Sequence, residues 1–200
     1  MDDPERLPGA RDVRVSLDGE DNDRVVVALP PHPQMGGDRR DSRLRAISEE
    51  LTDAAVDCLR IDYGPWDGGE GERTDAITAL EWATDRYEQV GLFGYSFGAS
   101  IALLAGGELE PDQEPVAISA LAPSATVGND LDVEGALDSI AVPVQVVYGE
   151  RDGTVDWGPV VDRAGELGWA VESVPADHFF VGQTTAVANR IAAFFVDRFA

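Results

Sequence analysis

The sequence contains no lysine. Its 15 basic residues are all arginine and face 38 aspartates and glutamates, so the formal net charge is -23. A surface of this charge repels phosphate backbones and anionic lipid headgroups, so we expect neither a nucleic-acid nor a membrane partner. An acidic excess without lysine resembles the proteins of salt-accumulating halophiles, whose charge repulsion is screened in concentrated salt. The alternative is an ordinary acidic protein.

Cysteine and long apolar segments are also scarce. The single cysteine, Cys58, lies in a predicted strand, cannot form an internal disulfide and is expected to be a small core residue. No His/Cys cluster has metal-ligand spacing and no glycine loop carries a phosphate-binding lysine, so we expect no metal and no cofactor. Without a signal peptide or a membrane-spanning run, the expected location is the cytoplasm.

The length of 200 residues fits one domain, residues 1–200, without an internal repeat or a low-complexity linker. The polar start of the chain, about residues 1–10, is expected to be frayed. Residues 25–29 form a continuous apolar run typical of a strand buried on both faces, whereas residues 13–17 alternate as an edge strand does. Further strands are expected at 55–61, 90–93, 116–121, 142–148 and 169–174, and helices at 39–52, 73–88, 99–105, 155–167 and 183–199. Repeated β–α units of this kind predict an α/β fold with a parallel sheet and right-handed crossovers.

The most informative motif is Gly94-Tyr95-Ser96-Phe97-Gly98, which stands between a predicted strand and a predicted helix. A sharp strand-to-helix turn with flanking glycines exposes the serine oxygen at the carboxyl edge of the sheet. The following helix directs its N-terminal amides at a developing oxyanion. Ser96 is therefore the candidate nucleophile.

A serine nucleophile needs a base, and the base needs an acid that orients it. His178 is the histidine that follows Ser96, and enzymes with this turn have the chain order Ser, acid, His. The acid is expected just after the strand at 142–148, where Asp152 lies. Three other acids remain alternatives: Asp156, Glu150 and Asp177.

Four segments of the chain resemble those of a known family: PHPQMGG, GYSFGA, GERDGTV and ADHFF. They are similar to the small, lidless serine hydrolases of the α/β-hydrolase superfamily, particularly a dienelactone-hydrolase-like group with HPHP, GYSFGA and DHFF signatures. The resemblance extends from Val25 to the C-terminus. It implies an α/β-hydrolase fold with a mostly parallel, twisted sheet of about seven strands, helices on both faces and no cap domain. It also implies Ser96 as nucleophile, Asp152 as acid and His178 as base.

The chain departs from that group at two places. Pro30-Pro31-His32-Pro33 lacks the first histidine of the HPHP signature, and the loop within residues 61–72 is shortened. The second departure puts the shape of one pocket wall in question.

An oxyanion hole needs two backbone amides, one from the residue after the nucleophile and one from the loop after an early strand. Phe97 supplies the first. Because the prolines of the 30–33 loop have no amide hydrogen, Gln34 is the expected second donor, with Met35 as the alternative. His32 is expected to orient this loop rather than to act in catalysis.

Only residues 122–141 could hold an inserted lid, which is too short for a helical cap. We therefore expect an open pocket that accepts small or accessible acyl groups. Met35, Trp66, Trp157 and Phe179 lie in loops at the predicted active edge and are expected to contact the substrate.

The sequence thus predicts a serine hydrolase that cleaves a carboxylic ester or related small-molecule acyl substrate through an acyl-enzyme. A thioesterase, an amidase or an acyltransferase would use the same residues. A non-catalytic ligand-binding protein of the same fold is the alternative from another class. The oligomeric state stays open.

Overall fold

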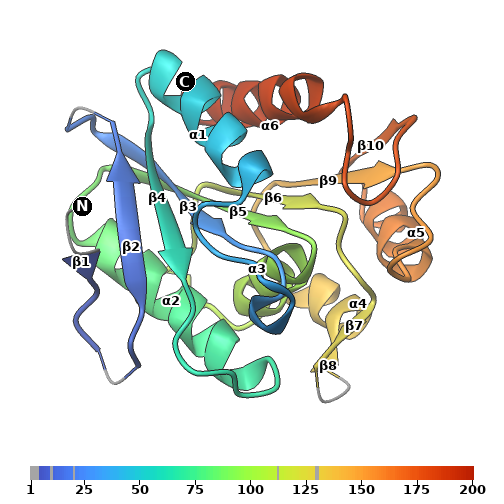
Figure 1. Ribbon diagram of the computed structural model, residues 1–200, viewed down its shortest axis with the longest axis horizontal. Helices are drawn as coiled ribbons and strands as arrows, with labels where there is room; N and C mark the ends of the chain where they lie inside the picture. The colour runs from blue at the N-terminus through green and yellow to red at the C-terminus, as the bar shows by residue number, and fades with distance from the viewer. Residues whose placement is uncertain (1–4, 10, 20, 112, 129–130) are drawn as a thin grey trace.

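One twisted sheet organises the chain, as Figure 1 shows. The computed structural model describes residues 5–200 except 10, 20, 112, 129 and 130. The strand order in the sheet is β1-β2-β4-β3-β5-β6-β9-β10. The strands are β1 (Glu5–Arg6), β2 (Arg14–Asp18), β3 (Arg24–Leu29), β4 (Asp57–Asp62), β5 (Gln89–Tyr95), β6 (Ala117–Leu121), β9 (Val144–Gly149) and β10 (Ala170–Val174).

Six neighbouring strands of this sheet pair in parallel, in the order β4-β3-β5-β6-β9-β10. By contrast, β2 runs antiparallel to β4, and β1 runs antiparallel to β2. Parallel pairing brings the carboxyl ends of these strands to one edge of the sheet. The loops after β3, β5, β9 and β10 therefore meet there, as in other open α/β folds. The mostly parallel sheet confirms the predicted fold class.

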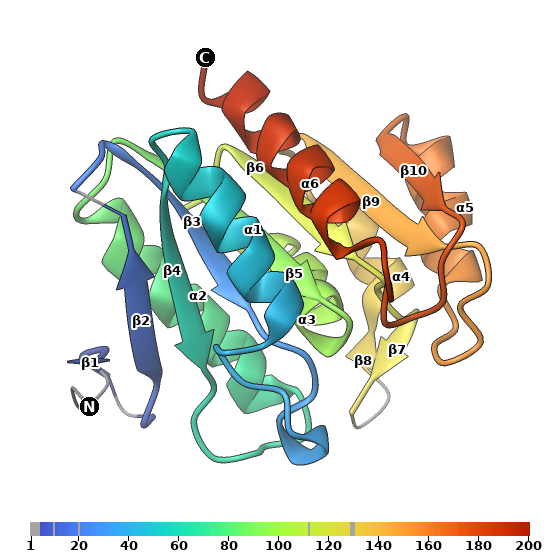
Figure 2. The ribbon, with the colours of Figure 1, turned by 45° about the horizontal axis from the view of Figure 1, so that its top comes forward.

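Helices cover both faces of the sheet. They are α1 (Ser42–Asp53), α2 (Glu70–Thr84), α3 (Phe97–Gly106), α5 (Gly158–Glu166) and α6 (Thr184–Arg198). Figure 2 shows α1 and α6 in front of the sheet, with α2, α3 and α5 behind it. Buried Leu44 and Phe195 belong to the core of the first face, and buried Leu80, Ile101 and Val160 to the core of the second. Burying one such side chain stabilises the fold by about 1.5–3 kcal/mol.

The start of the chain differs from the expectation of fraying. Residues 1–4 and 10 lie outside the described residues, but Glu5–Arg6 pairs with β2. Leu7 is buried, and its amide donates to the Val13 carbonyl at 3.0 Å. The expectation is therefore wrong for residues 5–7, because Leu7 gives this polar segment an apolar anchor. As a result β2 is the second strand from the edge rather than the edge itself.

The segment between β6 and β9 contains a small hairpin, β7 (Thr126–Val127) with β8 (Leu131–Asp132), and a four-residue helix, α4 (Val133–Ala136). It forms no helical cap in its described part, in agreement with the sequence. Cys58 is buried in β4, and burial raises the pKa of its thiol to about 12. Across the described residues, no helix combines the length and the apolar character that crossing a membrane requires.

Candidate active site

Ser96 occupies the sharp turn between β5 and α3. Its φ of 56° and ψ of -120° are strained for a residue with a side chain and are typical of a nucleophile elbow. The turn is crowded, since a Cβ on Gly94 would lie 2.1 Å from the Gly98 carbonyl oxygen. A Cβ on Gly98 would lie 2.4 Å from the Leu29 carbonyl oxygen of β3. Both flanking positions therefore require glycine.

A continuous chain of hydrogen bonds links Ser96, His178 and Asp152. The Ser96 Oγ lies 2.8 Å from His178 Nε2, and His178 Nδ1 lies 2.6 Å from Asp152 Oδ2. The side chains of His178 and Asp152 are 5% and 0% exposed. Because the carboxylate is sealed from water, its interaction with the imidazole is little screened.

The loop after β9 holds Asp152 at two further points. The Thr154 amide donates to Asp152 Oδ1 at 2.8 Å, and the Trp157 indole nitrogen donates to the Asp152 carbonyl at 3.0 Å. The histidine is held from β5 as well, since the Tyr95 hydroxyl donates to the His178 carbonyl at 3.0 Å. Burial raises the pKa of Tyr95 to about 12, so this hydroxyl stays a donor.

None of the alternative acids hydrogen-bonds to His178 in the part of the chain that the structure describes. Glu150 accepts from the Ser173 hydroxyl at 2.9 Å, and Asp177 accepts from the Phe179 amide at 3.0 Å. Asp156 contributes its backbone carbonyl to the Ala125 amide at 2.8 Å. Asp152 is the carboxylate that the fold brings to the imidazole.

The loop after β3 corrects the expected oxyanion donor. It forms a 3-10 turn, Pro33–Met35, capped by the His32 side chain. The Gln34 amide donates to His32 Nδ1 at 3.2 Å, and the Met35 amide donates to the His32 carbonyl at 3.0 Å. The expectation for Gln34 and the alternative of Met35 are both wrong, because the turn already uses these amides.

The backbone amides of Phe97 and His32 make no hydrogen bond within the described residues. The Phe97 amide is the first of α3, where helix geometry leaves the N–H groups without intrahelical partners. The His32 amide precedes the capped turn, and both residues line the cavity beside Ser96. The sequence analysis considered the amides that follow the prolines of this loop and did not consider the amide of His32.

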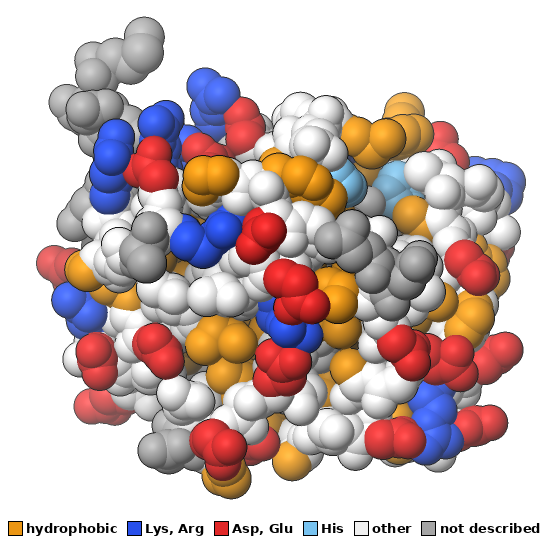
Figure 3. Space-filling model, turned by 90° about the horizontal axis from the view of Figure 1, so that it is seen from below, with side chains coloured by type: hydrophobic (Ala, Val, Ile, Leu, Met, Phe, Trp, Pro, Cys, Tyr) orange, Lys and Arg blue, Asp and Glu red, His pale blue; other side chains and the backbone are white. Residues whose placement is uncertain are grey.

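An open cavity of about 630 Å³ lies over Ser96. Met35 and Phe179, two of the expected substrate contacts, line it with 86% and 52% of their surface exposed. Figure 3 shows histidine surface beside hydrophobic side chains, with acidic side chains spread over the rest of that face. Across the described residues, no group of three or more His, Cys, Asp or Glu is arranged to hold a metal ion.

Part of the cavity wall was not expected from the sequence. The hairpin contributes Thr126 and Val127, and the first turn of α1 contributes Arg43. The guanidinium of Arg43 lies 4.6 Å from the centre of the Tyr95 ring and pairs with Asp41. The sequence did offer one signal for Arg43, because it lies near the start of the helix predicted to follow the loop after β3.

The two tryptophans expected at the substrate do not line this cavity. Trp66 packs against the rings of His32 and Phe97, and Trp157 stacks on Tyr148 with the ring centres 4.4 Å apart. Both indoles therefore pack against other aromatic rings and do not face the cavity. The expectation of substrate contact is wrong for them because their rings are used in packing.

The sequence matches no protein-family model and no curated protein. Its fold is similar to solved structures. An α/β serine hydrolase homologue from Coxiella burnetii is 22% identical, with 97% of this chain and 96% of that chain covered and a TM-score of 0.80. An α/β serine hydrolase without lid from Xanthomonas campestris is 23% identical, with coverages of 98% and 94% and a TM-score of 0.77. A dienelactone hydrolase from Anabaena variabilis is 22% identical, with coverages of 98% and 97% and a TM-score of 0.80. The chain therefore has the α/β-hydrolase fold, as the resemblance implied.

Proposed function

We propose that this protein is a serine hydrolase that cleaves a carboxylic ester or a related small acyl compound through an acyl-enzyme. The observation that carries the proposal is the hydrogen-bonded series from Ser96 through His178 to Asp152, which opens onto a cavity. The names of the similar structures, serine hydrolases and a dienelactone hydrolase, support the general class.

In acylation, His178 Nε2 takes the hydroxyl proton as Ser96 Oγ attacks the carbonyl carbon of the substrate. The carbonyl oxygen gains the negative charge and accepts hydrogen bonds from the amides of Phe97 and His32. Asp152 stabilises the imidazolium that forms. The C–O bond to the alcohol then breaks, and the alcohol leaves with the proton from His178.

Deacylation repeats these steps with water. His178 removes a proton from the attacking water, the second tetrahedral intermediate collapses, and Ser96 recovers its proton. The cavity is open, which gives water access to the acyl-enzyme and favours hydrolysis over acyl transfer to another alcohol. Met35 and Phe179 give this opening an apolar rim suited to the hydrocarbon part of an acyl group.

The test is the pre-steady-state hydrolysis of p-nitrophenyl acetate and p-nitrophenyl butyrate in molar KCl. We expect a burst of up to one p-nitrophenol per active site followed by slower turnover. Ser96→Ala should remove both phases. Ser173→Ala is the matched control, because the Ser173 hydroxyl lies outside the cavity and donates to Glu150. A Ser96→Ala variant that keeps wild-type turnover would refute the proposal.

A further inference from the structure

Three aromatic side chains contact one another at the cavity wall: His32 and Phe97, which line the cavity, and Trp66, which does not. We call them the aromatic clamp. The ring of His32 lies 4.5 Å from that of Trp66 and 4.8 Å from that of Phe97, centre to centre. The rings of Trp66 and Phe97 are 5.6 Å apart. Two members of this clamp, His32 and Phe97, line the cavity, and their backbone amides make no hydrogen bond within the described residues.

The loop that carries His32 needs an external support. Its hydrogen bonds from Gln34, Met35, Gly36 and Gly37 are all accepted within residues 32–33, so they shape the turn but do not tie it to the sheet. The Tyr63 hydroxyl makes one tie, a 3.3 Å hydrogen bond to the Pro30 carbonyl. The aromatic clamp connects the His32 side chain with Phe97 at the start of α3.

Trp66 is itself held firmly on both sides. The preceding residue, Pro65, accepts a hydrogen bond from the Arg11 guanidinium, and the following residue, Asp67, donates its amide to Glu72 Oε1 at 3.0 Å. Glu72 is fully buried at the start of α2, and its Oε2 accepts from the Gly69 amide at 2.8 Å. The loop therefore cannot shift without breaking charge-assisted hydrogen bonds.

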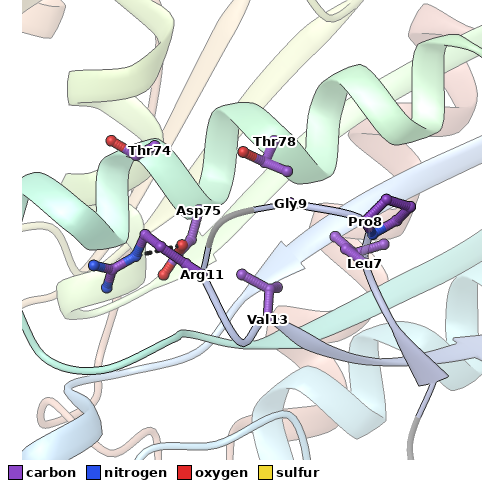
Figure 4. A pocket seen from close by; sticks show the side chains of 8 residues that line it. All are labelled: Leu7, Pro8, Gly9, Arg11, Val13, Thr74, Asp75 and Thr78. Carbon is purple, nitrogen blue, oxygen red and sulfur yellow. Dashed lines mark hydrogen bonds and ion pairs between the residues drawn. The ribbon is translucent and has the colours of Figure 1, made fainter.

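Arg11 is anchored in turn by α2. Its Nε donates at 2.7 Å to Asp75 Oδ1, and the other oxygen of Asp75 accepts from the Gly64 amide at 2.9 Å. Figure 4 shows Arg11 and Asp75 in contact, beside a small cavity of about 80 Å³ lined in part by Leu7 and Thr78. These contacts make the loop of Trp66 a rigid support.

We propose that Trp66 is a positioning residue of the oxyanion hole. By packing against both rings, it fixes the His32 amide relative to the Phe97 amide without touching the substrate. Oxyanion stabilisation requires donors at about 2.7–3.1 Å from the oxygen in the transition state, so a displaced loop lowers kcat more than it weakens substrate binding. This inference rests on the proposed function.

The first experiment compares Trp66→Ala with Trp82→Ala in the hydrolysis of p-nitrophenyl butyrate. Trp82 is a matched control, because it is half-buried against the same core but lies on α2 outside the cavity lining. We expect Trp66→Ala to lower kcat about 10- to 100-fold with KM within about threefold of wild type. Trp82→Ala should keep kcat within about twofold. Trp66→Phe retains an aromatic ring and should recover most of the lost kcat.

Two further readouts separate positioning from general destabilisation. A trifluoromethyl ketone with a butyl chain forms a tetrahedral oxyanion on the nucleophile, so its Ki should rise in Trp66→Ala by the factor by which kcat/KM falls. Hydrogen–deuterium exchange of residues 30–38 should accelerate in Trp66→Ala and not in Trp82→Ala, whether or not the variant turns over.

Equal losses in the two alanine variants, or a Trp66→Ala variant whose Ki for the ketone is unchanged, would overturn the positioning role. In either case a wild-type protein that is active and acylated at Ser96 would leave the proposed function standing. A folded wild-type protein without activity would overturn both.

Discussion

Replacing Asp152 by asparagine perturbs the site with the smallest change of shape. Asp152 Oδ1 accepts the Thr154 amide and Oδ2 faces His178 Nδ1. An asparagine here keeps its carbonyl oxygen toward the Thr154 donor, so its NH2 group faces His178. The imidazole must then accept at Nδ1 and carry its proton on Nε2, where it cannot take the proton of Ser96.

The expected loss in kcat is about 10³–10⁴-fold, which corresponds to about 4–5.5 kcal/mol of transition-state stabilisation. The side chain of Asp152 is fully buried, so neither water nor a buffer anion can reach His178 Nδ1 in its place. The assay is steady-state hydrolysis of p-nitrophenyl butyrate in molar KCl, with thermal unfolding of each variant measured in the same buffer. KM should change little, because Asp152 does not line the cavity.

Glu150→Gln is the control, because Glu150 lies in the same loop and its carboxylate bonds to Ser173 instead. Its kcat should stay within about threefold of wild type. An Asp152→Asn variant within about tenfold of wild type, or an equally large loss in Glu150→Gln, would refute the reasoning.

Three other predictions concern stability. Burial lowers the pKa of His32 below its ordinary 6.5, with Glu72 opposing the shift, so folding favours the neutral imidazole that accepts the Gln34 amide. The unfolded chain then binds more protons below about pH 6.5, so stability falls as the pH decreases through that value. Urea unfolding at about pH 7.5 and 5.5 should show this loss in wild type and a smaller one in His32→Gln, and equal losses would contradict it. Gly98→Ala should destabilise the fold by about 1–3 kcal/mol and abolish esterase activity, because its Cβ meets the carbonyl oxygens of Leu29 and Pro30 at 2.4 and 2.5 Å; a stable, active variant would contradict this. Because the net charge is -23, the midpoint of urea unfolding should rise from about 0.1 M to molar KCl, and a midpoint independent of salt would leave the charge without this role.

The fold could be predicted from the sequence because its signals are local. The apolar run of β3 and the strand–glycine–serine–glycine–helix pattern around Ser96 each specify a structure within a few residues. Chain order and a strand-end position then identified His178 and Asp152, which the structure brings within hydrogen-bonding distance of each other. The N-terminal pairing of Glu5–Arg6 was missed, because two polar residues carry no strand pattern of their own.

The rest of the site depends on contacts that sequence spacing does not encode. The His32 side chain caps its own turn by accepting a hydrogen bond from the Gln34 amide. This contact determines which amide of the loop after β3 stays free, and the sequence pattern does not reveal it. Similarly, Trp66 and Trp157 lie in loops near the active edge, but whether an aromatic side chain faces substrate or packs behind it depends on its tertiary neighbours. Trp66 packs against the rings of His32 and Phe97.

The central claim is that Ser96 is an activated nucleophile, and covalent labelling tests it most directly. The purified protein is treated with a fluorophosphonate probe in molar KCl, and the adduct is located by peptide mass spectrometry. The account predicts one stable adduct on Ser96, which is lost in Ser96→Ala and strongly slowed in Asp152→Asn. Folded protein that forms no adduct, or forms it on another residue, would contradict the account.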